Sequence, residues 1–341
     1  MINPEGEYAL RAHDGILVLQ RGENASTDYY LRSRLAGTTA RVEIADLESS
    51  PAVCALLQDQ GLQALLVIIC RYASKPWLDA LQASRARLAR VAYFLDDDLP
   101  AIIRDASLPH AVRSKVALHY GELVDQLGAL ASEVWVSSAV LAERYGAVRP
   151  RLLYPLPEEN PPEPAGDQER RLVYHGTDVH GAERRFVIEV ARRLPALGCE
   201  ARIEITGDRA LRAACSDLPN VEVVPQLAWP DYRRTQAGAR AAISLAPLFA
   251  SEVNDARAPV KAFDAARLGA AGIFADAPAY RGFVRPGLDG LLLPMDADAW
   301  ARAISDLLAD ANRRVGLATT ARARLIELRR SGAALPAPMA A

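Results

Sequence analysis

The chain has 341 residues, of which 50% are hydrophobic and 24% are charged, and its formal net charge is −2. The length predicts two domains of roughly 150–180 residues, and the composition is typical of a soluble globular enzyme. The small net charge argues against general nucleic-acid binding, and the sequence contains no apolar run of the roughly 18 residues that span a bilayer.

The opening sequence, MINPEGEY, lacks the basic and apolar regions of a signal peptide, which predicts a cytoplasmic protein. The four cysteines form no CxxC pair, which favours reduced core thiols and argues against a zinc site. Two basic helical stretches, SRARLAR at 84–90 and IELRR at 326–330, are typical of solvated helix faces. The alternative for them is peripheral contact with an anionic membrane surface.

Short apolar runs alternate with helical patterns in the first half, which predicts a parallel sheet covered by helices. The expected strands are 15–20, 64–70, 91–95, 133–137 and 151–154, and the expected helices include 51–60, 75–88, 109–130 and 139–145. The first domain therefore covers residues 1–154. A linker at 155–170 follows it, because this acidic stretch contains five prolines.

The same alternation restarts in the second half. The expected strands are 171–175, 201–206, 221–224, 241–245, 272–275 and 290–293, and helices begin near Ala182, Arg209, Pro230, Pro259 and Asp296. The second domain covers residues 171–311, a terminal helix covers 312–330, and 331–341 is expected to be a disordered tail. The fold class is thus α/β, with two Rossmann-like, doubly wound domains facing a central cleft, where such sheets bind ligands.

The most informative stretch begins a predicted helix. Pro259 suits its first position, and the free N–H groups of a first turn attract anions. Arg257 and Lys261 add two cations there, each unfavourable by roughly 0.3–1 kcal/mol unless an anion binds, and phosphate is the usual one. Asp264 shares a helical face with Lys261 and would accept hydrogen bonds from ribose hydroxyls. The alternative is a solvated Lys261–Asp264 pair beside a turn in which Asp255 caps the helix.

Lys261 also stands out by composition, because only three of the 40 basic residues are lysines. A compact ammonium at this turn suits a point contact with a phosphate oxygen. Two further polar residues are candidates for donor contacts. His180 follows the glycine turn at Gly176, and Asn254 lies in the loop ahead of the phosphate helix. Either side chain would hydrogen-bond a sugar or phosphate, or else only shape its own loop.

Three consecutive carboxylates, Asp96, Asp97 and Asp98, follow an apolar strand, where a parallel sheet presents functional groups. We assign Asp97 to positioning or deprotonating an acceptor hydroxyl. The structural alternative is that Asp98 caps the next helix and its neighbours are solvated. A metal-bound pyrophosphate site is a further alternative. The pattern of two sheets and the basic phosphate site argue against it, so no metal is expected.

The second half resembles the C-terminal domain of GT-B glycosyltransferases, especially retaining group 1 (family 4-like) enzymes that build bacterial surface polysaccharides. The matching segments, in order, are YHGTDVHGAERRFVIEVARRL (174–194), EITGD (204–208), VEVVPQLAWPDYRRTQAGARAAISLAPL (221–248) and NDARAPVKAFDAARLGAAGIFADAPAYRGFVRPGLDGLLL (254–293). The resemblance covers about half the chain. The helices at 297–330 resemble the usual terminal pair, part of which crosses back to the first domain.

The resemblance implies transfer of a sugar from a nucleotide-sugar donor to a glycan or lipid-linked saccharide acceptor. It implies no cofactor beyond the donor substrate, and a setting in lipopolysaccharide, capsule or exopolysaccharide synthesis. Arg257 and Lys261 would bind the donor diphosphate, and Asp264 the ribose. The residues implied near the base are Pro225, Gln226 and Leu227, and those whose backbone N–H groups would approach phosphate or sugar are Gly176 and Thr177.

The sequence also departs from the family pattern. Many relatives have two Glu residues separated by seven positions, where this chain has Ala256 and Asp264, and His180-Gly181 replaces a usual Lys-Gly. Two alternatives therefore stay open. One is a nucleotide-sugar epimerase of the same fold, which needs paired acids and bases around the sugar. The other is a non-catalytic nucleotide-binding subunit, which Ala256 allows. A nicotinamide dehydrogenase is disfavoured, because no GxGxxG follows any predicted strand.

Overall fold

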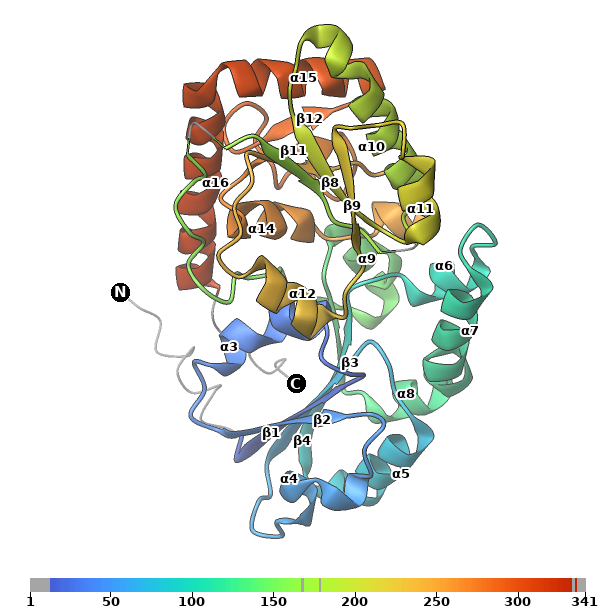
Figure 1. The fold of residues 1–341 in the computed structure, drawn as a ribbon. Helices are drawn as coiled ribbons and strands as arrows, with labels where there is room; N and C mark the ends of the chain where they lie inside the picture. The colour runs from blue at the N-terminus through green and yellow to red at the C-terminus, as the bar shows by residue number, and fades with distance from the viewer. Residues whose placement is uncertain (1–12, 167–168, 178, 333–334, 336–341) are drawn as a thin grey trace. The chain divides into compact units, whose positions relative to one another are not determined.

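A computed structural model describes residues 13–166, 169–177, 179–332 and 335, and contains two six-stranded parallel sheets flanked by helices (Figure 1). The described residues form two compact units, one of 13–158 with 256–258 and one of 159–255 with 259–331. The expected α/β class with two doubly wound sheets is confirmed. The first twelve residues and most of the expected tail at 331–341 lie outside the described residues.

The sheet of the first unit has the strand order β2-β1-β3-β4-β5-β6. Its strands are β1 (Gly15–Gln20), β2 (Arg41–Asp46), β3 (Leu65–Cys70), β4 (Leu88–Leu95), β5 (Glu133–Val136) and β6 (Arg151–Leu152). All neighbours pair in parallel. The central strands β1 and β3 are buried along their whole length, as their unbroken apolar runs predict. The edge strand β2 is largely exposed, which explains why its mixed sequence predicted no strand.

The helices of the first unit are mostly short. They are α2 (Ala25–Thr27), the π-helix η1 (Asp28–Arg32), α3 (Ser33–Leu35), α4 (Ala55–Gln58), α5 (Lys75–Ala83), α6 (Leu99–Arg104), α7 (His110–His119), α8 (Val124–Leu130) and α9 (Ala139–Arg144), with 3₁₀ turns at Pro51–Val53, Arg85–Arg87, Gly121–Leu123 and Gly146–Val148. The prediction of one helix at 109–130 was wrong. A 3₁₀ turn that begins at Gly121 separates α7 from α8, and glycine is a weak helix former.

The sheet of the second unit has the order β12-β11-β10-β7-β8-β9, again all parallel. Its strands are β7 (Arg171–Tyr174), β8 (Arg202–Gly207), β9 (Val221–Pro225), β10 (Ile243–Ala246), β11 (Ala271–Ala275) and β12 (Leu291–Leu293). Its helices are α10 (Gly181–Arg193), α11 (Arg209–Ala214), α12 (Trp229–Gln236), α13 (Glu252–Asp255), α14 (Val260–Arg267), α15 (Ala297–Ala309) and α16 (Ala311–Ser331), with a 3₁₀ turn at Pro195–Leu197.

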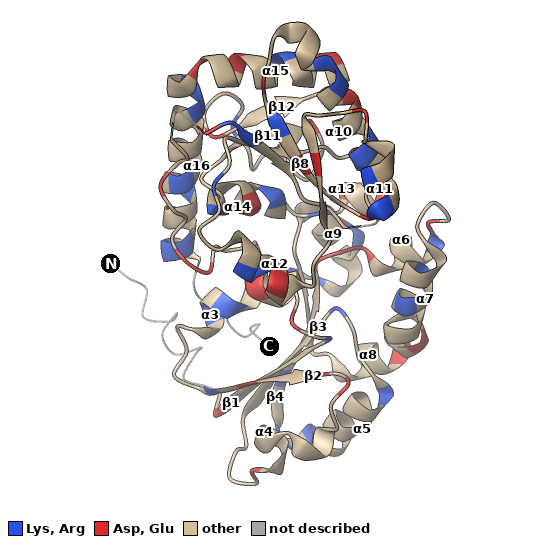
Figure 2. Ribbon diagram, viewed as in Figure 1, with Lys and Arg blue, Asp and Glu red and all other residues tan. Residues whose placement is uncertain are grey.

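The terminal helix α16 packs against β11, α14 and α15 within the second unit. Basic residues run along it (Figure 2), and several bind the Pro-rich segment that precedes β7. Arg314 Nη2 lies 3.2 Å from the carbonyl of Gly166, and Arg322 Nη2 lies 2.7 Å from the carboxylate of Glu163. The described part of the expected linker is therefore fastened to this helix.

The basic stretches predicted on helix faces are largely engaged within the chain. Arg87 donates to four backbone carbonyls, those of Leu56, Leu57, Asp59 and Leu62. Arg329 Nη1 lies 3.1 Å from Asn160 Oδ1. These contacts favour a structural role over membrane contact. Among the described helices, none combines the length and apolarity needed to cross a membrane.

Candidate functional site

The strand order of the second sheet reverses between β7 and β10, so the loops that follow these two strands diverge to opposite sides. In doubly wound sheets, ligands bind at this reversal, beyond the carboxyl ends of the strands. His175 immediately follows β7, and α14 lies between β10 and β11 along the chain. The predicted phosphate helix is therefore part of the edge at which this fold binds ligands.

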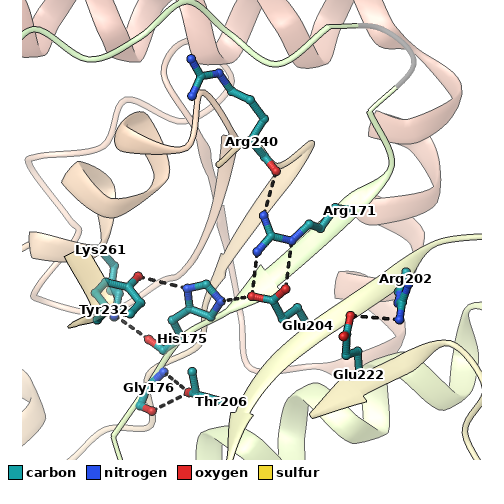
Figure 3. A network of polar contacts seen from close by, with 10 residues as sticks. All are labelled: Arg171, His175, Gly176, Arg202, Glu204, Thr206, Glu222, Tyr232, Arg240 and Lys261. Atoms are coloured by element: carbon teal, nitrogen blue, oxygen red, sulfur yellow. Dashed lines mark hydrogen bonds and ion pairs between the residues drawn. The ribbon is translucent and has the colours of Figure 1, made fainter. Parts of the chain in front are cut away.

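Lys261 lies in the first turn of α14 and connects that helix to the end of β7. Its Nζ atom is 2.6 Å from the carbonyl oxygen of His175 (Figure 3) and 3.0 Å from Oδ2 of Asp264. An ammonium has three donors, so these two acceptors leave one N–H for a ligand. Asp264 is 8% exposed, and its Oδ1 lies 3.4 Å from Arg267. The predicted Lys261–Asp264 pair exists, but it is partly buried and anchored to the sheet.

The start of α14 differs by one residue from the prediction. Pro259 is the N-cap, with φ −78°, and the helix begins at Val260. No side chain caps it, so the alternative in which Asp255 caps this helix is wrong. The first-turn N–H groups of α14 consequently have no capping acceptor from a side chain, which suits an anion at this end.

A chain of buried polar contacts lies behind Lys261. The Nε2 atom of His175 is 2.8 Å from Glu204, and its Nδ1 is 3.0 Å from the hydroxyl of Tyr232 (Figure 3). Arg171 binds the same carboxylate through two nitrogens, at 2.7 and 3.1 Å. The chain of contacts thus ends on His175, whose backbone carbonyl receives Lys261. A small, partly open hollow is lined by Tyr232, His175, Lys261 and Asp264, among others.

The protonation of this network follows from its partners. Burial alone raises the pKa of Glu204, but hydrogen bonds from His175 and Arg171 lower it to about 2. The carboxylate is therefore ionised, and Nε2 of His175 carries the proton that it donates to Glu204. Burial raises the pKa of Tyr232, so its hydroxyl stays protonated and donates to Nδ1. The ring of His175 is thus held in one tautomer and one orientation.

The glycine turn after β7 is tied to the neighbouring strand. The N–H of Gly176 donates to Oγ1 of Thr206 at 2.9 Å, and that hydroxyl donates to the carbonyl of Gly176 at 2.6 Å. A Cβ at position 176 would lie 2.7 Å from the hydroxyl of Tyr174, so a larger residue here would displace the Tyr174 ring. Gly176 is at the predicted edge, but its N–H is already donated to Thr206. Thr177 is exposed beside it.

A second polar cluster joins the loops that follow β7 and β10. His180, the N-cap of α10, has its Nδ1 atom 3.7 Å from Glu183, and Asn254 Nδ2 lies 3.4 Å from the same carboxylate. The backbone N–H of Phe249 also donates to Glu183, at 3.3 Å. Burial raises the pKa of Glu183, but these hydrogen bonds, chiefly from His180, bring it below its usual value. The structure therefore brings His180 and Asn254 together around a buried carboxylate.

The remaining predicted donor residues belong to other segments of the chain. Pro225, Gln226 and Leu227 are exposed at the end of β9, the outermost strand on that side of the sheet. Arg257 belongs to the segment 256–258, which groups with the first unit, whereas Lys261 belongs to the second. The carbonyl of Ala256 accepts a hydrogen bond of 2.6 Å from Ser138 Oγ, the N-cap side chain of α9.

The three carboxylates after β4 divide into two roles. Asp98 caps α6, accepting from the N–H of Ala101 at 3.0 Å, and also binds Arg144 at 2.6 Å. The structural alternative is therefore confirmed for Asp98. Asp96 and Asp97 instead meet Arg71, at 3.1 and 2.8 Å. Within the described residues, no three His, Cys, Asp or Glu side chains gather into a metal site.

Sequence reasoning missed four residues of these networks, which are Arg171, Glu183, Glu204 and Tyr232. One signal was present, because Glu204 interrupts the apolar strand β8 with a charge. A charge inside a buried strand calls for a partner, but the sequence does not say which one.

Comparisons with known proteins agree with this geometry. Residues 169–310 match the model of the family described as glycosyl transferases group 1. No curated protein sequence matches the chain significantly. Among solved structures, HepE from Anabaena in complex with UDP and glucose aligns with a TM-score of 0.58 and 14% identity, covering 92% of this chain and 95% of that one.

Two further structures extend the likeness. Sucrose-phosphate synthase from Thermosynechococcus elongatus gives a TM-score of 0.55 and 14% identity, covering 92% of this chain and 94% of that one. TarM gives a TM-score of 0.56 and 11% identity, covering 79% of this chain and 53% of that one. The fold is therefore of the GT-B type. The family match over residues 169–310 spans all six strands of the second sheet.

Proposed function

We propose that the chain is a glycosyltransferase that moves a sugar from a nucleotide diphosphate donor to a glycan or lipid-linked saccharide. The observation that carries the proposal is the position of Lys261. Its ammonium is held by the carbonyl of His175 and by Asp264, and one N–H remains for a ligand. Lys261 lies within residues 169–310, which match the group 1 family. HepE has been solved with UDP-glucose. A uridine diphosphate sugar is accordingly the first donor to test.

The main catalytic contribution of this site would be to stabilise the negative charge of the leaving group. As the bond from the sugar C1 to the diphosphate oxygen breaks, negative charge grows on the leaving group. The free N–H of Lys261 and the uncapped start of α14 would stabilise that charge, with Arg257 from the preceding loop. Asp264 would accept hydrogen bonds from the ribose hydroxyls. The base of the nucleotide would lie near Pro225, Gln226 and Leu227.

The acceptor side completes the reaction. A new bond forms between C1 and the acceptor oxygen, and the acceptor proton passes to the departing phosphate, so a strong base is not required. This route retains the anomeric configuration. His180 and Asn254 would bind sugar hydroxyls, and Asp97 would orient the acceptor hydroxyl. The proposed setting is the synthesis of a bacterial surface polysaccharide on the cytoplasmic side of the membrane.

The test is turnover of labelled UDP-sugars with and without a mixture of glycan acceptors. Lys261→Ala should lower nucleotide release and sugar transfer at least 100-fold, the order expected when one charge-stabilising donor is lost. Lys75→Ala is the matched control, because Lys75 is exposed and pairs with Asp79 on the surface of the first unit. Equal turnover in the wild type and in Lys261→Ala would refute the proposal.

The same reactions separate the alternatives. An isomerised donor sugar formed without acceptor would identify an epimerase. Nucleotide binding without any turnover would identify a non-catalytic subunit. A thermal-shift panel of nucleotides should precede the assay, because a ligand specific to the site raises the apparent stability by mass action.

A further inference from the structure

The first sheet reverses its strand order between β1 and β3, and an unusual turn lies at this point. Arg71, the residue after β3, has φ +63°. The N–H of Tyr72 donates to the carbonyl of Cys70 at 2.7 Å, which makes residues 70–72 a γ-turn centred on Arg71. Such turns with a positive φ are rare and strained, and strained residues concentrate at functional sites.

Neighbouring strands hold this turn in place. The N–H of Arg71 donates to the carbonyl of Phe94 at 2.9 Å, and the hydroxyl of Tyr93 donates to the carbonyl of Arg71 at 2.7 Å. Asp96 and Asp97 bind the guanidinium. The position of Arg71 is therefore fixed at both its backbone and its side chain, at the edge where a doubly wound sheet binds ligands.

A second cation lies against the same turn without a carboxylate partner. The Nζ atom of Lys115, on α7, is 5.4 Å from the centre of the Tyr72 ring, and the guanidinium of Arg71 is 5.2 Å from it. Across the described residues, Lys75 pairs with Asp79 and Lys261 with Asp264, but Lys115 has no carboxylate within 4 Å. Its contact with the Tyr72 ring is therefore its main compensation for partial burial.

The two neighbouring charges that act on the pKa of Lys115 are both cations. Burial, followed by the charges of Arg71 and Arg21, lowers its pKa. Arg21 directly follows β1 and meets Glu48 at 3.2 Å, with both side chains exposed. Three cations thus converge on the reversal from β1, β3 and α7. A half-buried ammonium that is repelled by its neighbours is stabilised when an anion binds it.

We propose that the first unit binds an anionic group of the acceptor, a sugar carboxylate or phosphate, on Lys115 beside the Arg71 turn. The inference rests on the proposed function and deepens it by giving the charge class of the acceptor. Arg71 positions the site, because its guanidinium is already bound by two carboxylates. Lys115 makes the direct contact, and Arg21 adds attraction from the rim. Asp97, which binds Arg71, would orient a hydroxyl of the same ligand.

The scarcity of lysine makes a direct test simple. With lysine labelled with ¹³C at Cε alone, the side-chain spectrum contains three signals, from Lys75, Lys115 and Lys261. Each is assigned by its Lys→Gln variant. The probes are methyl glucuronide for the carboxylate, glucose 6-phosphate for the phosphate and methyl glucoside as the neutral control, with UDP for the donor site.

The signal of Lys115 should move saturably with the glucuronide or the sugar phosphate, and stay in place with the neutral glucoside. The probe that saturates the shift at the lower concentration shows whether the site prefers a carboxylate or a phosphate. In Lys115→Gln, binding of that probe, followed by calorimetry, should weaken at least tenfold while the signals of Lys75 and Lys261 report an intact fold.

Two results would overturn the inference. One is a Lys115 signal that neither anionic sugar moves, and the other is an equal shift of all three lysines, which indicates general ionic screening. UDP distinguishes this failure from failure of the proposed function. If UDP moves Lys261 while the anionic sugars leave Lys115 unmoved, only the acceptor inference falls. If neither UDP nor any other nucleoside diphosphate of the panel moves Lys261, the donor site itself is refuted.

Discussion

The Nε2 atom of His175 lies 2.8 Å from a carboxylate oxygen of Glu204, and this contact ties the end of β7 to the middle of β8. It fixes the residue whose carbonyl receives Lys261. A side chain one strand away thereby sets the position of the cation that we assign to the donor diphosphate.

Glu204→Gln should reduce the free energy of unfolding of the second unit by about 2–3 kcal/mol at pH 7, given its pKa shift and partial burial. The pKa of Glu204 is lowered from 4.5 to about 2, so the stabilisation is fully present above pH 4.5 and is lost as the pH falls toward 2. The variant should therefore show a flatter pH dependence in that window, measured by calorimetric unfolding.

Glu222→Gln is the matched control for that prediction. Glu222 pairs with Arg202 at 3.1 Å on the neighbouring strand pair (Figure 3), but both side chains are exposed. Its loss should cost less than about 1 kcal/mol. If the two variants behave alike across pH 2–4.5, the buried network does not stabilise the site.

Asp264→Asn should weaken UDP binding about tenfold, because one charge-assisted hydrogen bond is worth roughly 1.5–3 kcal/mol. It should also remove the preference for UDP over 2′,3′-dideoxy-UDP, measured by calorimetry. Asp231→Asn serves as control, since Asp231 is exposed and pairs with Arg234 on α12. A variant that still prefers the ribose as strongly as the wild type would exclude Asp264 from that contact.

Two glycines with almost the same backbone angle test the packing of the segment before β7. Gly269 has φ +62° and Gly198 has φ +63°. A Cβ at 269 would lie 2.6 Å from the carbonyl of Glu163, whereas a Cβ at 198 would meet nothing within 4 Å. Gly198→Ala should cost about 1–2 kcal/mol from the backbone alone, and Gly269→Ala at least about 2 kcal/mol more. Equal melting temperatures would contradict this packing.

Asp97 and Asp98 should separate function from stability. Asp98→Ala removes a helix cap and the partner of Arg144, so unfolding of the first unit should become easier by about 1–3 kcal/mol, with transfer retained below the melting temperature. Asp97→Asn should lower transfer at least tenfold while donor hydrolysis continues, as expected for a residue that orients the acceptor. The reverse pattern would show that the two roles have been exchanged.

The sequence predicted most strands because each central strand is an unbroken apolar run bounded by turn residues. The start of α14, to within one residue, and the pairing of Lys261 with Asp264 were also readable, since a spacing of three residues places side chains on one helical face. The partners of these residues were not readable. The contact from Lys261 to His175 spans 86 positions, and no local pattern encodes which carbonyl a lysine reaches.

The Arg71 turn shows a second limit. Positive φ values are predicted from glycine or asparagine, and Arg71 carries neither signal. Its conformation comes from Phe94 and Tyr93 on β4 and from the two carboxylates that follow this strand, which are tertiary contacts. Asp98 was readable as a cap for the opposite reason, because capping depends on a residue three positions away.

Each sheet completes its reversal of strand order inside one unit, with its own loops and its own cations. Under the proposed function, substitutions in one unit can then change the preference for the donor, and substitutions in the other unit can change the preference for the acceptor. A chimera that replaces 259–331 together with 159–255 by the equivalent part of a relative, leaving 256–258 in place, would be expected to change the sugar delivered without changing the molecule that receives it.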